Sequence, residues 1–240
     1  MNRSTDPAAI LGIDTATAAA AVAVTRAEQL LSERLADPSP EGRPRHASAL
    51  LAEVEAAVGE AGGWEQIALL AVGVGPGTFT GLRIGIATAR ALAQARGVPL
   101  AGVSSLAALA RGIDGREPDR PRLAAIDARR GEAFAGLYEA AGGELWEPFV
   151  AAPEALAERV ASLPEPPLAA GDGSLRFRSQ LEAAGAEVLP DADPAHLVAA
   201  RHICALGAEA QPGRLEQVKP IYLRRPDAEV WREQRHKAGA

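Results

Sequence analysis

The sequence predicts an α/β protein of two lobes, each built on a mixed sheet flanked by helices. Short apolar runs of strand length alternate with longer segments whose apolar residues recur at helical spacing. The first half reads as three strands followed by helix, strand, helix and strand, and the second half echoes this order without a detectable sequence repeat. A length of 240 residues allows one large domain or two small ones.

The first half contains five predicted strands and two predicted helices. The fourth apolar run is uninterrupted, which suits a strand buried on both faces. Prolines and glycines mark the loops, above all in segment 37–45 and at Gly75-Pro76-Gly77. The turn Asp14-Thr15-Ala16-Thr17 joins the first two strands through short polar side chains. Strands are expected at 9–14, 18–25, 29–35, 67–74 and 99–103, and helices at 46–61 and 81–96.

The second half follows a charged, proline-containing segment, 114–121, that suits a lobe boundary. Strands are expected at 122–126, 133–139, 144–150 and 168–170, and helices at 153–163, near 174–184 and at 194–210. We therefore expect an N-terminal lobe over 1–102 and a C-terminal lobe over 103–193. A helix and a strand over 194–225 are expected to return toward the first lobe, and 226–240 form a charged tail.

Composition excludes several classes of protein. Cys204 is the only cysteine, so neither a disulfide framework nor a cysteine-rich zinc site can form. The first seven residues lack the apolar core of a signal peptide, and no apolar segment is long enough to span a bilayer. With 25 Lys and Arg against 31 Asp and Glu, the net charge of −6 disfavours unaided binding to nucleic acid. We expect a cytoplasmic protein without a membrane contact.

One stretch could carry chemistry, the glycine-rich loop over 73–83 that joins a buried strand to a helix. Backbone N–H groups and the positive end of the helix dipole could hold an anion there. Neither the Walker A spacing nor G-x-G-x-x-G is present, and a tight turn whose threonines cap the helix is the alternative. Asp14 could position a metal ion or a water near a phosphate, or simply close a turn. The candidate phosphate or nucleotide contacts are Asp14, Thr15, Gly75, Gly77 and Thr78.

The remaining polar residues favour structural roles. None of the four histidines pairs with another at the i, i+4 spacing of a metal site, since Leu50 follows His46 at that distance. Ser104 and Ser105 lie outside a G-x-S-x-G elbow and are expected to cap the helix that begins near Leu106. The charged turn at 127–132 reads as a solvated hairpin. The turn at 171–173 could line a cleft.

Several motifs, in their order along residues 9 to 225, resemble the TsaB (YeaZ) family. The long glycine motif is highly specific, and the others add weight together. The motifs are Ile10-Leu11-Gly12-Ile13-Asp14-Thr15, Gly75-Pro76-Gly77-Thr78-Phe79-Thr80-Gly81-Leu82-Arg83-Ile84-Gly85, Ser104-Ser105-Leu106, Asp127-Ala128-Arg129-Arg130-Gly131-Glu132, Gly171-Asp172-Gly173 and Pro220-Ile221-Tyr222-Leu223-Arg224.

The resemblance implies the two-lobed fold of actin, Hsp70 and the sugar kinases, the ASKHA fold. It also implies a role in making N6-threonylcarbamoyladenosine (t6A) in tRNA. The family's members are regarded as non-catalytic subunits that pair with a catalytic paralogue, TsaD, and are joined by a small ATPase, TsaE. It implies no catalytic residue, no metal and no cofactor bound by this chain alone, although ATP or ADP could touch Asp14 and the glycine loop in the complex. Contact with tRNA would be indirect. The alternative is an autonomous kinase or peptidase of the same fold.

The two helices expected at 46–61 and 81–96 carry little charge and many alanines. One face of each must cover its own sheet, and small residues elsewhere permit close helix packing. We expect them to pack against the equivalent helices of the paralogue as a four-helix interface, and to form a homodimer when the chain is alone. The residues expected in this interface are His46, Leu50, Val54, Arg83, Ala87 and Arg90.

Overall fold

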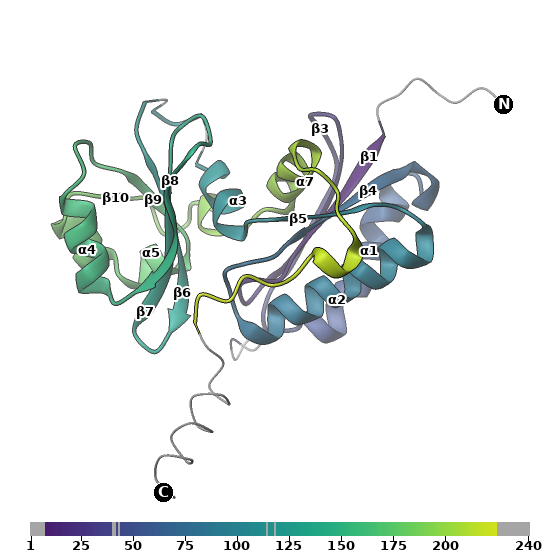
Figure 1. Ribbon diagram of the computed structural model, residues 1–240, viewed down its shortest axis with the longest axis horizontal. Coiled ribbons are helices and arrows are strands. Elements are labelled where there is room, and N and C mark those ends of the chain that lie inside the picture. Colours follow the sequence, from purple (N-terminus) through teal and green to yellow (C-terminus); the bar gives the residue numbers. More distant parts are fainter. Residues whose placement is uncertain (1–7, 40–41, 43, 114, 118, 225–240) are drawn as a thin grey trace, which may run out of the picture.

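The computed structural model describes residues 8–39, 42, 44–113, 115–117 and 119–224, which form two α/β lobes (Figure 1). The first lobe holds a five-stranded sheet in the order β3-β2-β1-β4-β5. Its first three strands form an antiparallel meander, and β4 and β5 run parallel to β1. The strands are β1 (Ala9–Asp14), β2 (Ala20–Arg26), β3 (Gln29–Ala36), β4 (Ile67–Gly73) and β5 (Leu100–Val103).

The second lobe repeats this topology with a sheet in the order β10-β9-β6-β7-β8. Three antiparallel strands are again followed by two that are parallel to the first of them. The echo predicted from element order is therefore confirmed in three dimensions. The strands are β6 (Arg122–Arg129), β7 (Glu132–Tyr138), β8 (Glu144–Ala151), β9 (Leu168–Ala170) and β10 (Glu187–Val188).

Helices α1 (His46–Glu60) and α2 (Phe79–Arg96) cover one face of the first sheet. Helix α7 (Ala200–Glu209) packs against the opposite face. Leu50 of α1 and Ile86 of α2 share one apolar core with Leu11 and Leu70 of the sheet. Burial of each apolar side chain of this size contributes about 1.5–3 kcal/mol to the free energy of unfolding. Helix α7 lies close to the sheet because Gly207 faces Ala71, where an added Cβ would meet Ala71 Cβ at 2.4 Å.

Helix α3 (Ser105–Arg111) lies at the junction of the lobes and contacts both β6 and α7. Alternate residues of β6 point to opposite faces of the second sheet. Ile126 therefore joins the core around α3 and α7, whereas Leu123 packs with α4 (Pro153–Ala161) and α6 (Arg178–Ala183). The shared core around α3 binds the two lobes into one structure.

Two expected helices are shorter than predicted. The helix expected near 174–184 is divided into α5 (Asp172–Arg176) and α6, because Phe177 leaves the helical range with φ −110° and ψ 25°. The helix expected over 194–210 begins as a 3-10 turn, Pro194–His196, and α7 starts only at Ala200. Extended backbone at Leu197 and Ala199 separates the two pieces.

The strand expected at the end of segment 194–225 does not form in the residues that the structure describes, which end at 224. We call residues 218–224 the C-terminal strap, because they cross from the first sheet to the second lobe (Figure 1). The Ile221 amide donates to the Val74 carbonyl oxygen at 2.8 Å, and Arg224 Nη1 donates to the Ala128 carbonyl oxygen at 2.9 Å. These two hydrogen bonds, one of them from a side chain, do not form the backbone ladder of a β-strand. The tail predicted over 226–240 lies outside the described residues.

Short connections complete the fold. Two further 3-10 turns, Trp64–Gln66 and Leu215–Gln217, precede β4 and the strap. In the described part of the chain, no helix combines the length and apolar character needed to cross a membrane.

Candidate functional site

The carboxylate of Asp14 lies at the end of β1, where the first lobe meets α3. It is 1% exposed and accepts two hydrogen bonds, from Ser105 Oγ at 2.6 Å and from the Ala16 amide at 2.8 Å. Burial raises the pKa of Asp14 to about 6, against the opposing effect of these two hydrogen bonds. The Ala16 bond closes the turn predicted after the first strand.

The glycine-rich loop packs directly on this turn. Thr15 Oγ1 donates to the Gly81 carbonyl oxygen at 2.8 Å, and the Thr78 amide donates to the Ala16 carbonyl oxygen at 2.8 Å. A Cβ added at Gly77 would meet the Ala16 carbonyl oxygen at 2.5 Å, and one added at Gly81 would meet that of Thr15 at 2.1 Å. Glycine is therefore required at both positions by the close approach of two backbone segments.

All five residues predicted to contact a phosphate thus come together, but their arrangement is that of a closed turn. The Gly75 amide is taken by Ser105 Oγ at 3.3 Å, and the Thr78 amide by the Ala16 carbonyl oxygen. An anion site at a helix start needs backbone N–H groups that point at the ligand. The geometry favours a tight turn that seats α2 on the end of β1. The expected capping of this helix by threonine is wrong, because Thr78 occupies the N-cap without a side-chain hydrogen bond and its Oγ1 is buried without a partner among the described residues.

The two adjacent serines have different roles. Ser104 caps α3, since its Oγ accepts from the Ala107 amide at 3.2 Å. Ser105 was expected to share this capping role, but it lies inside the helix and binds Asp14, 91 residues earlier. Only one of two consecutive residues can occupy the N-cap. The sequence therefore indicated that one of the two serines has another role.

The second lobe contains the counterpart of the Asp14 turn. Asp127 is the sixth residue of β6, as Asp14 is of β1, and its Oδ1 accepts from the amide two residues later, that of Arg129, at 2.8 Å. Asp127 Oδ2 pairs with Arg176 at 2.8 Å, and the Asp127 amide donates to Asp172 at 2.9 Å. The turns at 127–132 and 171–173 therefore bind each other. Burial, first among several causes, raises the pKa of Asp172.

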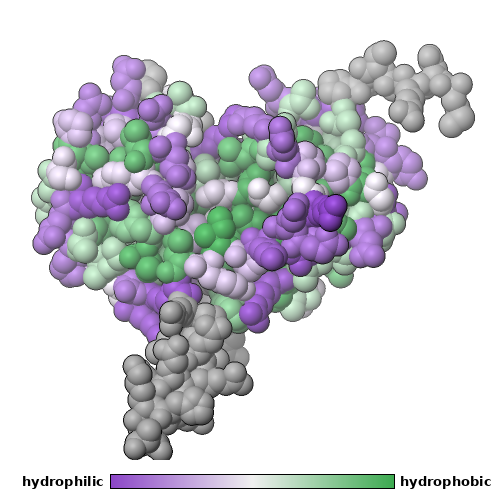
Figure 2. All heavy atoms as spheres, viewed as in Figure 1, coloured by the Kyte–Doolittle hydropathy of each residue, from purple (hydrophilic) through white to green (hydrophobic). Residues whose placement is uncertain are grey.

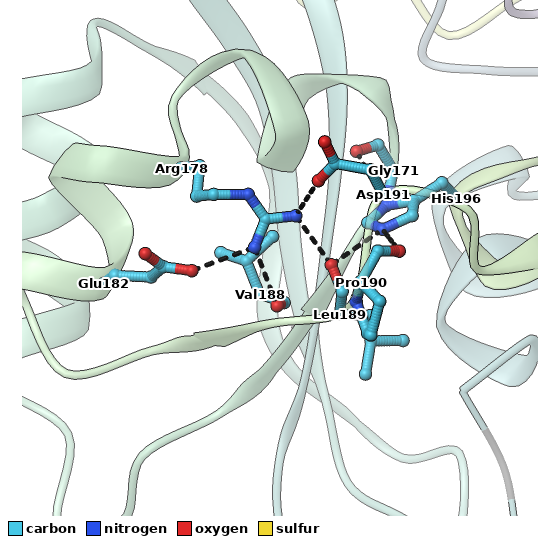
Figure 3. Close-up of polar contacts among 8 residues, drawn as sticks. All are labelled: Gly171, Arg178, Glu182, Val188, Leu189, Pro190, Asp191 and His196. Atoms are coloured by element: carbon cyan, nitrogen blue, oxygen red, sulfur yellow. Dashed lines mark hydrogen bonds and ion pairs between the residues drawn. The ribbon is translucent and has the colours of Figure 1, made fainter.

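His196 and Arg178 bind backbone groups of the second lobe (Figure 3). The Gly171 amide donates to His196 Nδ1 at 3.1 Å, which assigns the ring proton to Nε2, from where it reaches the Leu189 carbonyl oxygen at 3.1 Å. Arg178 donates to the carbonyl oxygens of Val188 and Leu189 at 2.9 and 2.7 Å. Both ring nitrogens of His196 bind backbone groups. These partners lie in other segments of the chain, so the sequence alone did not indicate this structural role.

The other described histidines are also separate from one another. His46 is buried, with Nε2 3.2 Å from the Ala19 carbonyl oxygen, and burial lowers its pKa. Burial, reinforced by Arg201 and Arg111, lowers the pKa of His202 to about 4. Within the described ranges, no three His, Cys, Asp or Glu side chains gather as a metal site.

The predicted interface residues of α1 need correction. His46, Leu50 and Val54 are 3%, 1% and 0% exposed, because they lie on the face that covers this chain's own sheet. The exposed apolar residue of the helix is Leu51, which is 57% exposed and stands one position from Leu50. Consecutive helical residues point about 100° apart, so a shift of one residue decides which leucine faces outward.

The predicted interface residues of α2 lie on the outer surface, but two of them also bind this chain. Arg83 Nε donates to Tyr222 Oη at 3.0 Å, and Arg90 donates to the Glu216 carbonyl oxygen at 3.3 Å and to the Val218 carbonyl oxygen. Both arginines therefore hold the C-terminal strap and the residues before it. Ala87 remains exposed and has no side-chain polar group.

Comparison with known proteins identifies the family. A family model described as TsaD, tRNA N6-adenosine threonylcarbamoyltransferase, matches residues 39–215. The tRNA threonylcarbamoyladenosine biosynthesis protein TsaB of Escherichia coli (strain K12) is 34% identical over 226 residues, 90% of this chain and 94% of that protein.

Solved structures agree with this assignment and with the predicted fold. The structure of YeaZ from Pseudomonas aeruginosa matches 90% of this chain and 100% of its own, with 28% identity and a TM-score of 0.74. The ROK hexokinase of Thermus thermophilus, at 16% identity and a TM-score of 0.51, covers 84% of this chain and 99% of its own and shows the sugar-kinase fold alone. The chain, as its motifs predicted, belongs to the TsaB (YeaZ) family of tRNA threonylcarbamoyladenosine biosynthesis proteins.

Proposed function

We propose that this chain is a non-catalytic subunit of the machinery that forms t6A in tRNA. In this role it binds a catalytic paralogue of the TsaD type and supports transfer of the threonylcarbamoyl group by that paralogue. The E. coli relative is named for t6A biosynthesis, and the matching family model is named for the transferase. The observation that carries the non-catalytic role is the closed Asp14 turn, in which the carboxylate and the amides of Ala16, Gly75 and Thr78 are already bound within the chain.

The outer surface of α1 and α2 is the proposed contact with the paralogue. Leu51 on α1 and Ala87 on α2 are exposed, and helices α1 and α2 contact each other. An exposed leucine beside small side chains allows a second helix pair to approach closely, as in a helix bundle. The same surface can pair with itself around a two-fold axis, so a homodimer is expected without the paralogue.

The remaining partners follow from this role. We place a TsaE-like ATPase in the same assembly, and tRNA contact chiefly on the paralogue, since this chain carries a net charge of −6. Any ATP or ADP contact is assigned to the assembled complex, because the chain's own glycine loop is packed against residues 14–16. The cytoplasm is the proposed compartment.

Reconstitution tests this function. The paralogue, the ATPase, tRNA and threonylcarbamoyl-AMP should form t6A only when this chain is added, as measured by mass spectrometry of digested tRNA. Ala87→Glu, which places a charge on the outer surface of α2, should reduce both paralogue binding and t6A formation. Ala141→Glu, in the turn between β7 and β8 and exposed like Ala87, is the matched control and should preserve both. ATPase or peptidase turnover by the chain alone, abolished in Asp14→Asn, would contradict the proposal.

A further inference from the structure

Two exposed aromatic rings from distant parts of the chain meet on the outer surface of α2. Phe79 begins the helix and Tyr222 lies in the strap; their ring centroids are 5.2 Å apart at an interplanar angle of 31°. Phe79 is 39% exposed, Tyr222 40% and the adjacent Ile221 38%. Single exposed apolar residues are ordinary, whereas two exposed aromatic rings in contact indicate an interaction site. On the face drawn in Figure 2, apolar side chains gather at the junction of the lobes, where the strap crosses (Figure 1).

Arg83 fixes the position of both rings and presents a positive charge beside them. Its Cζ lies 3.7 Å from the centroid of Phe79, and its Nε donates to Tyr222 Oη at 3.0 Å. Among the described residues, the two terminal nitrogens of Arg83 make no hydrogen bond. They remain available for the paired hydrogen bonds with which an arginine binds a carboxylate.

The strap that carries Tyr222 is held at several points, so these side chains are arranged in advance. Val218 is buried, the Ile221 amide donates to the Val74 carbonyl oxygen at 2.8 Å, and Arg224 binds the Ala128 carbonyl oxygen at 2.9 Å. Binding through side chains that are already ordered loses less conformational entropy than binding that must order them.

We propose that these residues form an anchor for the catalytic paralogue, an inference that rests on the proposed function. The occupant is a protein surface with an apolar pocket for Ile221 and Tyr222 and a carboxylate for Arg83. Tyrosine and arginine are the residue types that dominate binding energy at protein interfaces. The anchor also adjoins the outer surface of α2, since Arg83 and Ala87 lie one helical turn apart. We name Phe79, Arg83, Ile221 and Tyr222 the strap anchor.

Calorimetric titration of the full chain with the purified paralogue tests the strap anchor. Tyr222→Ala and Arg83→Gln should each weaken binding by tenfold or more. Leu145→Ala is the matched control: this leucine is 46% exposed on β8 of the second lobe, and its loss should change affinity by less than twofold. Binding of both anchor variants within twofold of the wild type would overturn the proposal.

Further measurements distinguish the loss of this contact from a loss of folding, of tRNA binding or of self-association. Tyr222→Phe keeps the ring and should retain more affinity than Tyr222→Ala, while unchanged thermal unfolding shows that the variants are folded. The anchor proposal is overturned if the variants lower only the tRNA affinity of the complex, or only self-association in sedimentation experiments. If the wild-type chain does not bind the paralogue, the proposed function fails together with the anchor. If the wild type binds and the anchor variants bind equally, the anchor alone fails.

Discussion

Ser105 Oγ donates a 2.6 Å hydrogen bond to Asp14 Oδ2 and thereby joins the start of α3 to the end of β1. Both residues are buried, and a Cβ added at Gly73 would lie 1.8 Å from the same carboxylate oxygen. The carboxylate is therefore enclosed by its own chain. This contact indicates a structural role for Asp14, rather than the chemical role that its position at the end of a strand suggests.

The buried carboxylate should give the protein a specific dependence of stability on pH. Because burial raises the pKa of Asp14 from 3.8 to about 6, the folded state binds this proton more tightly than the unfolded state. The group's contribution to the free energy of unfolding therefore falls as pH rises from about 4 to about 6, by about 3 kcal/mol at most. Asp14→Asn removes this contribution.

Urea denaturation of wild type and Asp14→Asn at pH 4 and pH 7 measures the effect. The stability of the variant relative to the wild type should be higher at pH 7 than at pH 4. Parallel pH profiles for the two proteins would show that Asp14 titrates as an ordinary exposed carboxyl.

Two glycines inside helices should respond oppositely to alanine. A Cβ at Gly85 of α2 would lie 2.2 Å from Thr15 Oγ1, so Gly85→Ala should destabilise the protein by about 1–3 kcal/mol through overpacking. Gly59 of α1 has no atom within 4 Å of the added Cβ, and Gly59→Ala should stabilise by up to about 1 kcal/mol through helix propensity. Chemical denaturation of both variants provides the comparison, and a loss of equal size at the two positions would contradict the close packing of α2 on the Thr15 turn.

Adjacent leucines on α1 should separate folding from association. Leu50→Asp places a charge in the core and should prevent stable folding, since an isolated buried carboxylate is costly. Leu51→Asp changes a side chain that is 57% exposed and should leave thermal unfolding nearly unchanged while abolishing the proposed homodimer. Analytical ultracentrifugation reports the second effect. A dimer that persists in Leu51→Asp would place the association surface elsewhere.

Cys204 should be unreactive in the folded protein. Burial raises the pKa of its thiol to about 12, and Sγ lies against β1 and β2, 3.5 Å from the carbonyl oxygens of Ile10 and Ala23. The thiolate is the reactive species, so a disulfide reagent at pH 8 should react slowly with the native chain and quickly in denaturant. A fast native reaction would mean that α7 readily leaves the first sheet.

Local sequence pattern was sufficient for most of the elements. The apolar runs at 67–74 and 168–170 lie within one residue of β4 and β9, because a strand buried on both faces needs a continuous apolar sequence. The pattern was insufficient at Phe177 and at 197–199, where two predicted helices are interrupted. The second break follows directly on His196, whose ring binds the backbone of Gly171 and Leu189.

The candidate site shows the same division. The sequence by itself determined the family and most of the strands and helices, since these depend on motif and periodicity, whereas the two-residue strand β10 was not predicted. Only the tertiary structure decided that Ser105 binds Asp14, that Leu51 rather than Leu50 faces outward, and that Arg83 holds Tyr222 139 residues away. The reason is physical, because a hydrogen bond or a buried face between distant segments exists only after both lobes have folded. The local sequence pattern does not specify which distant atoms will be in contact.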